Sequence, residues 1–123
     1  GVLVVEAPRH LGPEDCAVKN LACSLENHTN LKEFPWVVLV DNAEFTSANS
    51  RNFLWTVFTK TNPANDIDGV KPKIEHKHWS CEGPVLIDAR SKPHHAPALE
   101  EPPEITQKVN ELASKGGPLH GVI

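Results

Sequence analysis

Methionine is absent from this sequence, and cysteine occurs only three times in 123 residues. Cys16, Cys23 and Cys81 are odd in number and lack the spacing of a disulfide framework, which argues against a secreted scaffold and predicts a cytoplasmic protein. Cys16 and Cys23 lie on one expected helix, about 10 Å apart along its axis, which is too far for a bridge. Because the chain does not open on Met, we expect it to be a fragment of a longer protein.

Basic residues are also few, because twelve Lys and Arg face sixteen Asp and Glu and give a formal net charge of −4. A nucleic-acid binder needs a basic face for phosphates, so the charge balance argues against this class. No apolar run approaches the roughly 20 residues of a membrane span, and no signal peptide is recognisable. A glycine-rich phosphate loop is missing too, since Gly116 and Gly117 do not connect a strand to a helix.

What is present is an alternation of strand-like and helix-like segments, which indicates an α/β fold. Residues 36–40 are apolar at every position, as in a strand buried on both faces of a parallel sheet. We predict one layered βαβ domain over residues 1–123, with a small, mainly parallel sheet flanked by helices and a proline-rich extended segment at 91–103. The expected strands are 2–6, 36–40 and 84–88, with a short one near 74–78. The first expected helix is 13–26, which ends in a polar turn at 27–30. A second runs from caps at 47–50 to residue 60, and a third opens at 103–104 and is stopped by Gly116 and Gly117.

Three segments, in order along the chain, carry a resemblance to a known family. Residues 53–66 read FLWTVFTKTNPAND, residues 78–84 read HWSCEGP, and residues 87–97 read IDARSKPHHAP. The first resembles the run Thr-basic-x-Asp/Asn-Pro-Ala-x-Asp at a helix end in the C-terminal domain of UbiD-family decarboxylases. The other two look like the branch of that family that handles phenolic acids. The likeness covers about residues 36–97, and over residues 1–35 only the order of strand and helix agrees.

The resemblance implies a reversible, non-oxidative decarboxylase of phenolic acids such as protocatechuate, gallate or hydroxybenzoate. It also implies prenylated FMN with a divalent metal (manganese) and potassium in the full-length enzyme, and none of these bound to this fragment. The family's catalytic glutamate–arginine–glutamate set lies in the flavin-binding domain. It has no counterpart here, because Glu100, Glu101 and Glu104 have no arginine near them in sequence. The implied partners are that flavin-binding domain, other subunits of a homo-oligomer, and the phenolic acid.

In the family, the loop before the last strand lines the substrate pocket, and by resemblance it corresponds to His78, Trp79, Ser80 and Cys81. A histidine can hydrogen-bond a phenolic hydroxyl near neutral pH, and Trp79 could form an aromatic wall. The plainer interpretation is a surface histidine and a tryptophan on a sheet edge. Cys81 is expected to pack rather than react, because the implied flavin is the electron sink.

Charged residues follow two of the expected strands. Asp41 and Asp88 each close a strand at its carboxyl end, where ligands gather in open parallel sheets. The alternative is that each carboxylate caps the following turn. Arg90 and Lys92 could reach a neighbouring domain or a substrate carboxylate, or could form solvated ion pairs.

Two other functions stay open from the residues alone. One is a non-catalytic assembly or binding module that holds subunits together. The other is a small metal-binding protein, since zinc accepts histidine and cysteine ligands. The spacing of these candidates matches no common zinc finger, and the adjacent pair His94 and His95 would diverge on an extended chain. The candidate ligands are His76, His78, Cys81, His94 and His95.

Overall fold

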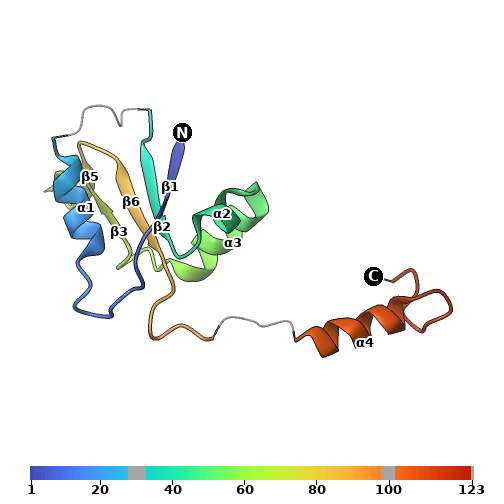
Figure 1. The fold of residues 1–123 in the computed structure, drawn as a ribbon. Helices are drawn as coiled ribbons and strands as arrows, with labels where there is room; N and C mark the ends of the chain where they lie inside the picture. The colour runs from blue at the N-terminus through green and yellow to red at the C-terminus, as the bar shows by residue number, and fades with distance from the viewer. Residues whose placement is uncertain (28–32, 98–101, 123) are drawn as a thin grey trace.

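The structure, a computed structural model, describes residues 1–27, 33–97 and 102–122. The turn predicted at 27–30 and the residues Glu100 and Glu101 therefore lie wholly or largely outside the described residues. Strands and helices alternate along the first part of the chain (Figure 1). In chain order they are β1 (Val2–Glu6), α1 (Ala17–Leu25), β2 (Trp36–Val40), α2 (Ala43–Ser47), α3 (Ser50–Lys60), β3 (Ile67–Gly69), β4 (Pro72–Glu75), β5 (His78–Cys81), β6 (Val85–Ala89) and α4 (Pro103–Ala113).

The main sheet has four strands in the order β1-β2-β6-β3. The first three are parallel, and their register places Val38 between Val4 and Ile87. The short edge strand β3 runs antiparallel to β6. The predicted α/β class with a mainly parallel sheet is therefore confirmed.

Helices cover both faces of this sheet, with α1 on one side and α2 and α3 on the other (Figure 1). On one face, Val38 and Ile87 pack against Phe53 and Val57 of α3. On the other face, Val37 and Leu86 pack against Ala22 of α1. Both faces of β2 and β6 are thus buried, which explains why these strands are almost wholly apolar in sequence.

Two asparagines begin the helices on the α2–α3 side. The Asn42 side chain accepts a hydrogen bond from Phe45 N at 2.7 Å, and Asn49 accepts one from Asn52 N at 2.9 Å. The helix predicted to start from the caps at 47–50 and to end at Lys60 is confirmed as α3, which Asn49 caps. The short helix α2 before it was not predicted. The first helix begins at Ala17 and not at Pro13, since residues 12–15 form a turn closed by Asp15 N and Gly12 O.

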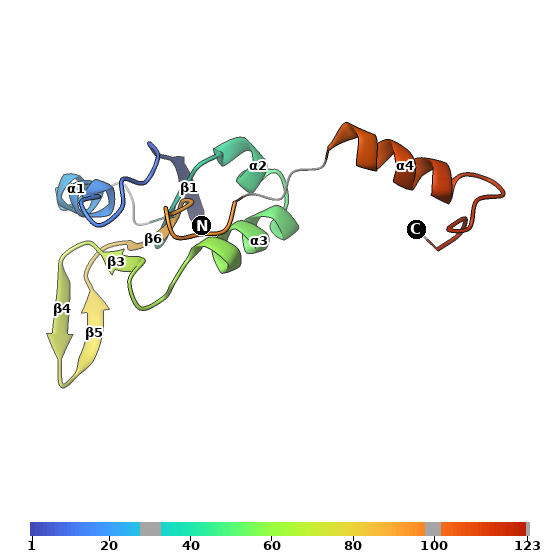
Figure 2. The ribbon, with the colours of Figure 1, turned by 90° about the horizontal axis from the view of Figure 1, so that it is seen from below.

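The prediction of one strand near residues 74–78 is wrong, because these residues form part of an antiparallel hairpin of β4 and β5. His76 and Lys77 make its two-residue turn, with φ values of 51° and 68°. Two successive residues with positive φ produce the tight hairpin turn that twists with its strands. The hairpin extends away from the main sheet on the side of β3 (Figure 2).

The predicted C-terminal helix is confirmed as α4, which stands apart from the sheet in both ribbon views (Figures 1 and 2). Its apolar side chains Ile105, Val109 and Leu112 are exposed. Among the described residues, none of the helices is long and apolar enough to span a membrane.

Candidate functional site

Charged side chains gather at the carboxyl ends of the parallel strands, and we call this group the edge cluster. Its members come from the loop after β1, from the segment after β2, from the end of α3 with the loop after it, and from β6 with the segment after it. They include four carboxylates but only three cations. The members are Asp15, Asp41, Lys60, Asp66, Asp88, Arg90 and Lys92.

Arg90 is the centre of the edge cluster, and its side chain has no exposed surface. Its Nε and Nη2 donate to the two carboxylate oxygens of Asp88 at 2.9 and 2.7 Å. Its Nη2 also donates to Asp15 Oδ1 at 2.7 Å, and its Nη1 donates to the Pro8 carbonyl at 2.8 Å. A planar guanidinium suits this paired geometry, which an ammonium could not reproduce.

Lys92 is buried beside Arg90 and binds a second set of oxygens. Its Nζ donates to the carbonyls of Lys60 and Asp88 at 2.8 and 2.5 Å, and it lies 3.1 Å from Asp66 Oδ2. The expectation of solvated ion pairs for Arg90 and Lys92 is therefore wrong. Both cations are bonded to groups of this chain and are buried, so they cannot reach a neighbouring domain.

The Asp88 carboxylate closes the turn that follows it, as the plainer interpretation predicted, whereas the Asp41 carboxylate binds residues far away in sequence. Asp88 Oδ1 accepts from Arg90 N at 3.1 Å. Asp41 Oδ2 accepts from Ser91 N at 2.9 Å and from Lys60 Nζ at 2.7 Å. Asp41 thus ties the end of β2 to the segment that follows β6.

These contacts shift the protonation of the edge cluster toward its charged forms. Hydrogen bonds from Arg90 hold the pKa of Asp15 well below its ordinary value, against the opposing effect of burial. Burial raises the pKa of Asp41, but hydrogen bonds from Lys60 and Ser91 outweigh it and the net shift is downward. The hydrogen bonds to Asp88 raise the pKa of Arg90 further. The ion pairs are consequently formed at neutral pH.

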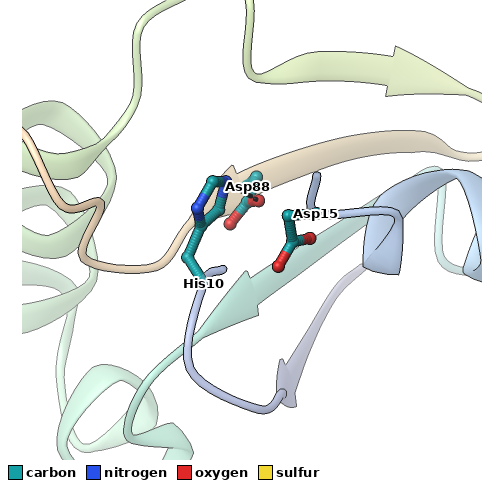
Figure 3. A group of neighbouring side chains, drawn as sticks. All are labelled: His10, Asp15 and Asp88. Carbon is teal, nitrogen blue, oxygen red and sulfur yellow. Dashed lines mark ion pairs between the residues drawn. The ribbon is translucent and has the colours of Figure 1, made fainter. Parts of the chain in front are cut away.

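His10 completes a trio with Asp15 and Asp88, whose nearest ligand atoms lie within 4.8 Å of one another (Figure 3). The trio does not have the chemistry of a metal site. His10 Nδ1 accepts a hydrogen bond from Gly12 N at 2.9 Å, so the proton of the neutral ring is on Nε2, the atom that faces Asp88. A ligating histidine needs a free lone pair there and usually donates from its other nitrogen. Both carboxylates are, moreover, already bonded to Arg90.

A cleft of about 560 Å³ opens beside the edge cluster. Its walls come from the loop after β1, the loop after α3 and the segment after β6, and include His10, Asn62, Asp66 and His94. Burial, followed by the nearby His94, lowers the pKa of His95, whose Nδ1 accepts from Lys92 N at 3.1 Å. The cleft is the position at which open parallel sheets bind ligands.

The residues predicted to touch substrate lie elsewhere, on strand β5 of the hairpin. Gly69 at the end of β3 pairs with Val85 at the start of β6, so the hairpin between them joins the amino edge of the parallel strands. The edge cluster lies at the opposite, carboxyl edge. The structure therefore separates His78, Trp79, Ser80 and Cys81 from Asp41, Asp88, Arg90 and Lys92.

Successive residues of a strand point to opposite faces, so His78 and Ser80 share one face of the hairpin, and Trp79 and Cys81 share the other. Trp79 pairs across the strands with Ile74. These two side chains are 45% and 75% exposed and form an apolar surface. Trp79 also reaches Gly69, where an added Cβ would lie 3.2 Å from its ring.

Cys81 packs at the base of the hairpin. Its Sγ lies 3.3 Å from the Gly83 carbonyl, and burial, followed by the charge of Asp68, raises the pKa of its thiol. A raised pKa keeps the thiol protonated at neutral pH and makes it a poor nucleophile. The candidate zinc ligands are divided between the two edges, with His76, His78 and Cys81 on the hairpin and His94 and His95 near the cleft.

Sequence reasoning missed Asp15, Asp66 and His10 as members of the carboxyl edge. In the sequence, Asp15 only suits the positive end of a helix dipole. The one available signal is its position in the loop after the first strand, which must end at the same edge as Asp88 in a parallel sheet.

Comparison with known proteins found relatives but no matching family model. A Chlamydia pneumoniae protein, named as one of the subunits of a 4-hydroxybenzoate decarboxylase, is 34% identical over 111 residues, which are 90% of this chain and 18% of that protein. An uncharacterized Chlamydia caviae protein is 34% identical over 87 residues, which are 71% of this chain and 15% of that protein. The chain thus spans less than a fifth of the length of these relatives.

Two solved structures share the fold, both of the vanillic acid decarboxylase of Sedimentibacter hydroxybenzoicus in its open form. One superposes with a TM-score of 0.54 at 18% identity, covering 89% of this chain and 26% of that one. The other gives a TM-score of 0.51 at 19% identity, covering 90% of this chain and 26% of that one. The chain is therefore related in sequence to part of a decarboxylase subunit, and its fold matches part of a decarboxylase structure.

Proposed function

We propose that this chain is the C-terminal domain of a UbiD-type, non-oxidative decarboxylase of phenolic acids. In this proposal it closes over the substrate and contributes oligomer contacts, while the catalytic glutamate–arginine–glutamate set belongs to another part of the enzyme. The observation that carries the proposal is the 34% identity to a 4-hydroxybenzoate decarboxylase subunit over 90% of the chain. The three motifs at residues 53–66, 78–84 and 87–97 support the same assignment.

The hairpin is the element that we propose to meet the substrate. His78 and Ser80 offer hydrogen-bonding groups on one face, where they could bind the hydroxyl or carboxylate of a phenolic acid. Trp79 and Ile74 offer an apolar surface on the other face, which would pack against the adjoining domain and exclude water. A hairpin of two four-residue strands is marginal alone in water, which favours a position between the sheet and a second polypeptide surface.

The cofactor belongs, in this proposal, to the rest of the enzyme. Prenylated FMN would supply the electron sink, with manganese and potassium at its phosphate. The described residues do not suit that phosphate, because the buried cations Arg90 and Lys92 are already bonded to carboxylates and carbonyls. The isolated chain is accordingly expected to have no decarboxylase activity.

The test uses the full-length enzyme with His78→Ala. We expect kcat/KM for the phenolic acid to fall about tenfold, the loss of one hydrogen bond to substrate, while bound flavin stays constant. His120→Ala, an exposed histidine near the end of the chain, is the matched control. Unchanged kinetics in His78→Ala, together with a loss in His94→Ala, would move the substrate to the carboxyl-edge cleft and overturn the proposal.

A further inference from the structure

Helix α3 carries a second apolar stripe that faces away from the sheet. Its inner residues Phe53 and Val57 pack in the core, whereas Arg51, Leu54, Trp55 and Phe58 are exposed. These four positions follow the i, i+3, i+4, i+7 spacing of one helix face. We call this surface the α3 stripe.

The α3 stripe is extended and held in place by α2. Phe45 of α2 meets Trp55 edge to face, with ring centroids 6.0 Å apart and planes at 81°. This geometry is favourable for aromatic pairs. The two rings therefore present one fixed apolar surface rather than two independent side chains.

The exposed apolar area is large for a chain of this size. Phe45, Trp55 and Phe58 are 45%, 49% and 79% exposed. With Leu54 they present roughly 400 Å², taking 150–250 Å² for each aromatic side chain. Patches of this size are often interaction sites, and two of them with a polar rim approach the ~1,000 Å² of a specific interface.

The order of residues along the α3 stripe indicates which partner fits it. A two-fold axis passing between Leu54 and Trp55 would place Leu54 against Trp55 of a second, antiparallel copy. The same axis would place Arg51 over Phe58 of that copy, at both ends of the contact. A guanidinium over an aromatic ring is attractive, whereas a parallel arrangement would oppose Arg51 to itself.

We propose that two copies of this chain associate through the α3 stripe in an antiparallel, isologous contact. Such contacts are the commonest symmetric interfaces, because one surface serves both protomers. The proposal names the surface and symmetry for the oligomer contact given under the proposed function, and its evidence lies in α3 and α2. Neither the hairpin nor the cleft beside the edge cluster takes part in it.

The experiment is sedimentation velocity of the 123-residue chain across protein concentration. We expect a concentration-dependent dimer, weakened about 30-fold or more by Phe58→Lys, since the most exposed aromatic side chain of the contact is lost at both of its ends and a lysine then faces Arg51. Adding Arg51→Glu to Phe58→Lys should restore most of the affinity, because opposite charges again meet across the two-fold axis. Unfolding curves confirm that each variant is folded, which is expected at exposed positions.

Two control variants test whether the dimer forms through the hairpin or through α4 instead. Ile74→Lys on the hairpin and Leu112→Lys on α4 replace exposed apolar residues outside the α3 stripe and should leave the dimer unchanged. A monomer at every concentration overturns the proposal. So does a dimer that survives Phe58→Lys but is lost in Leu112→Lys, or a double variant that stays as weak as Phe58→Lys alone. None of these readouts depends on decarboxylase activity.

Discussion

Arg90 and Asp15 are 75 positions apart in the chain, yet Arg90 Nη2 lies 2.7 Å from Asp15 Oδ1 in the buried edge cluster. The same guanidinium binds Asp88 and the Pro8 carbonyl. One side chain therefore joins the end of β6 to the loop that leads into α1. This contact positions α1 over the sheet and shapes one wall of the cleft.

Replacing Arg90 with methionine should strongly destabilise the fold. The substitution leaves the carboxylates of Asp15 and Asp88 buried without their cation, a change that costs about 3–5 kcal/mol. Chemical denaturation measures the free energy of unfolding. Arg9→Met, at an exposed position, is the control and should change it by less than about 0.5 kcal/mol. A loss of under about 1 kcal/mol in Arg90→Met would contradict the central role given to this residue.

Protonation of Asp15 in acid should lower the free energy of unfolding. Its pKa in the fold lies below its ordinary value of 3.8, so the ionised group stabilises the fold above that value, and this stabilisation is lost as pH falls below it. Asp15→Asn should be less stable at pH 7 but should show a flatter pH dependence below about pH 4. Urea denaturation at several pH values measures both, and Glu14→Gln, an exposed neighbour, should keep the wild-type slope.

A glycine at position 77 should stabilise the hairpin turn. Lys77 has a φ of 68°, which is strained for a residue with a Cβ and costs about 1 kcal/mol. Lys77→Gly should therefore stabilise the hairpin by a similar amount, seen as slower hydrogen exchange of the β4–β5 amides. Lys73→Gly, within extended β4, should instead speed that exchange. Equal effects of the two substitutions would show that the turn is not strained.

The three cysteines should differ in reactivity. Cys16 and Cys23 are exposed, whereas burial raises the pKa of the Cys81 thiol. With iodoacetamide at about pH 8, Cys81 should be alkylated several-fold more slowly than the other two, because less of it is thiolate. Peptide mass spectrometry resolves each site. In denaturant all three should react at similar rates, and rapid native labelling of Cys81 would exclude its packed position.

The parallel core was predictable from sequence because its signal is local. The runs at β2 and β6 are apolar on both faces, and only a sheet covered by helices on both sides buries such strands. The hairpin was not predictable, because its turn residues His76 and Lys77 lack the Asn-Gly signature of tight hairpin turns. Strand β3 has only three residues, too few to show a period.

The candidate site likewise has residues that could be predicted from the sequence and residues that could not. Asp41 and Asp88 were identifiable because each ends a recognisable strand. Their partners were not identifiable, since the pairing of Arg90 with Asp15 depends on how distant segments meet in three dimensions. Burial of the two cations Arg90 and Lys92 also contradicts the usual exposure of Arg and Lys. Three carboxylates and several backbone carbonyls around them make it favourable.

The location of the hairpin, inserted at the amino edge between β3 and β6, has an evolutionary consequence. Whatever the hairpin contacts, its residues can be exchanged without disturbing the buried ions at the far end of the same sheet. The selectivity of the hairpin's contacts and the stability of the fold then depend on separate sets of positions. Grafting a different hairpin onto this scaffold is therefore a direct route to altered recognition in a chain that still folds.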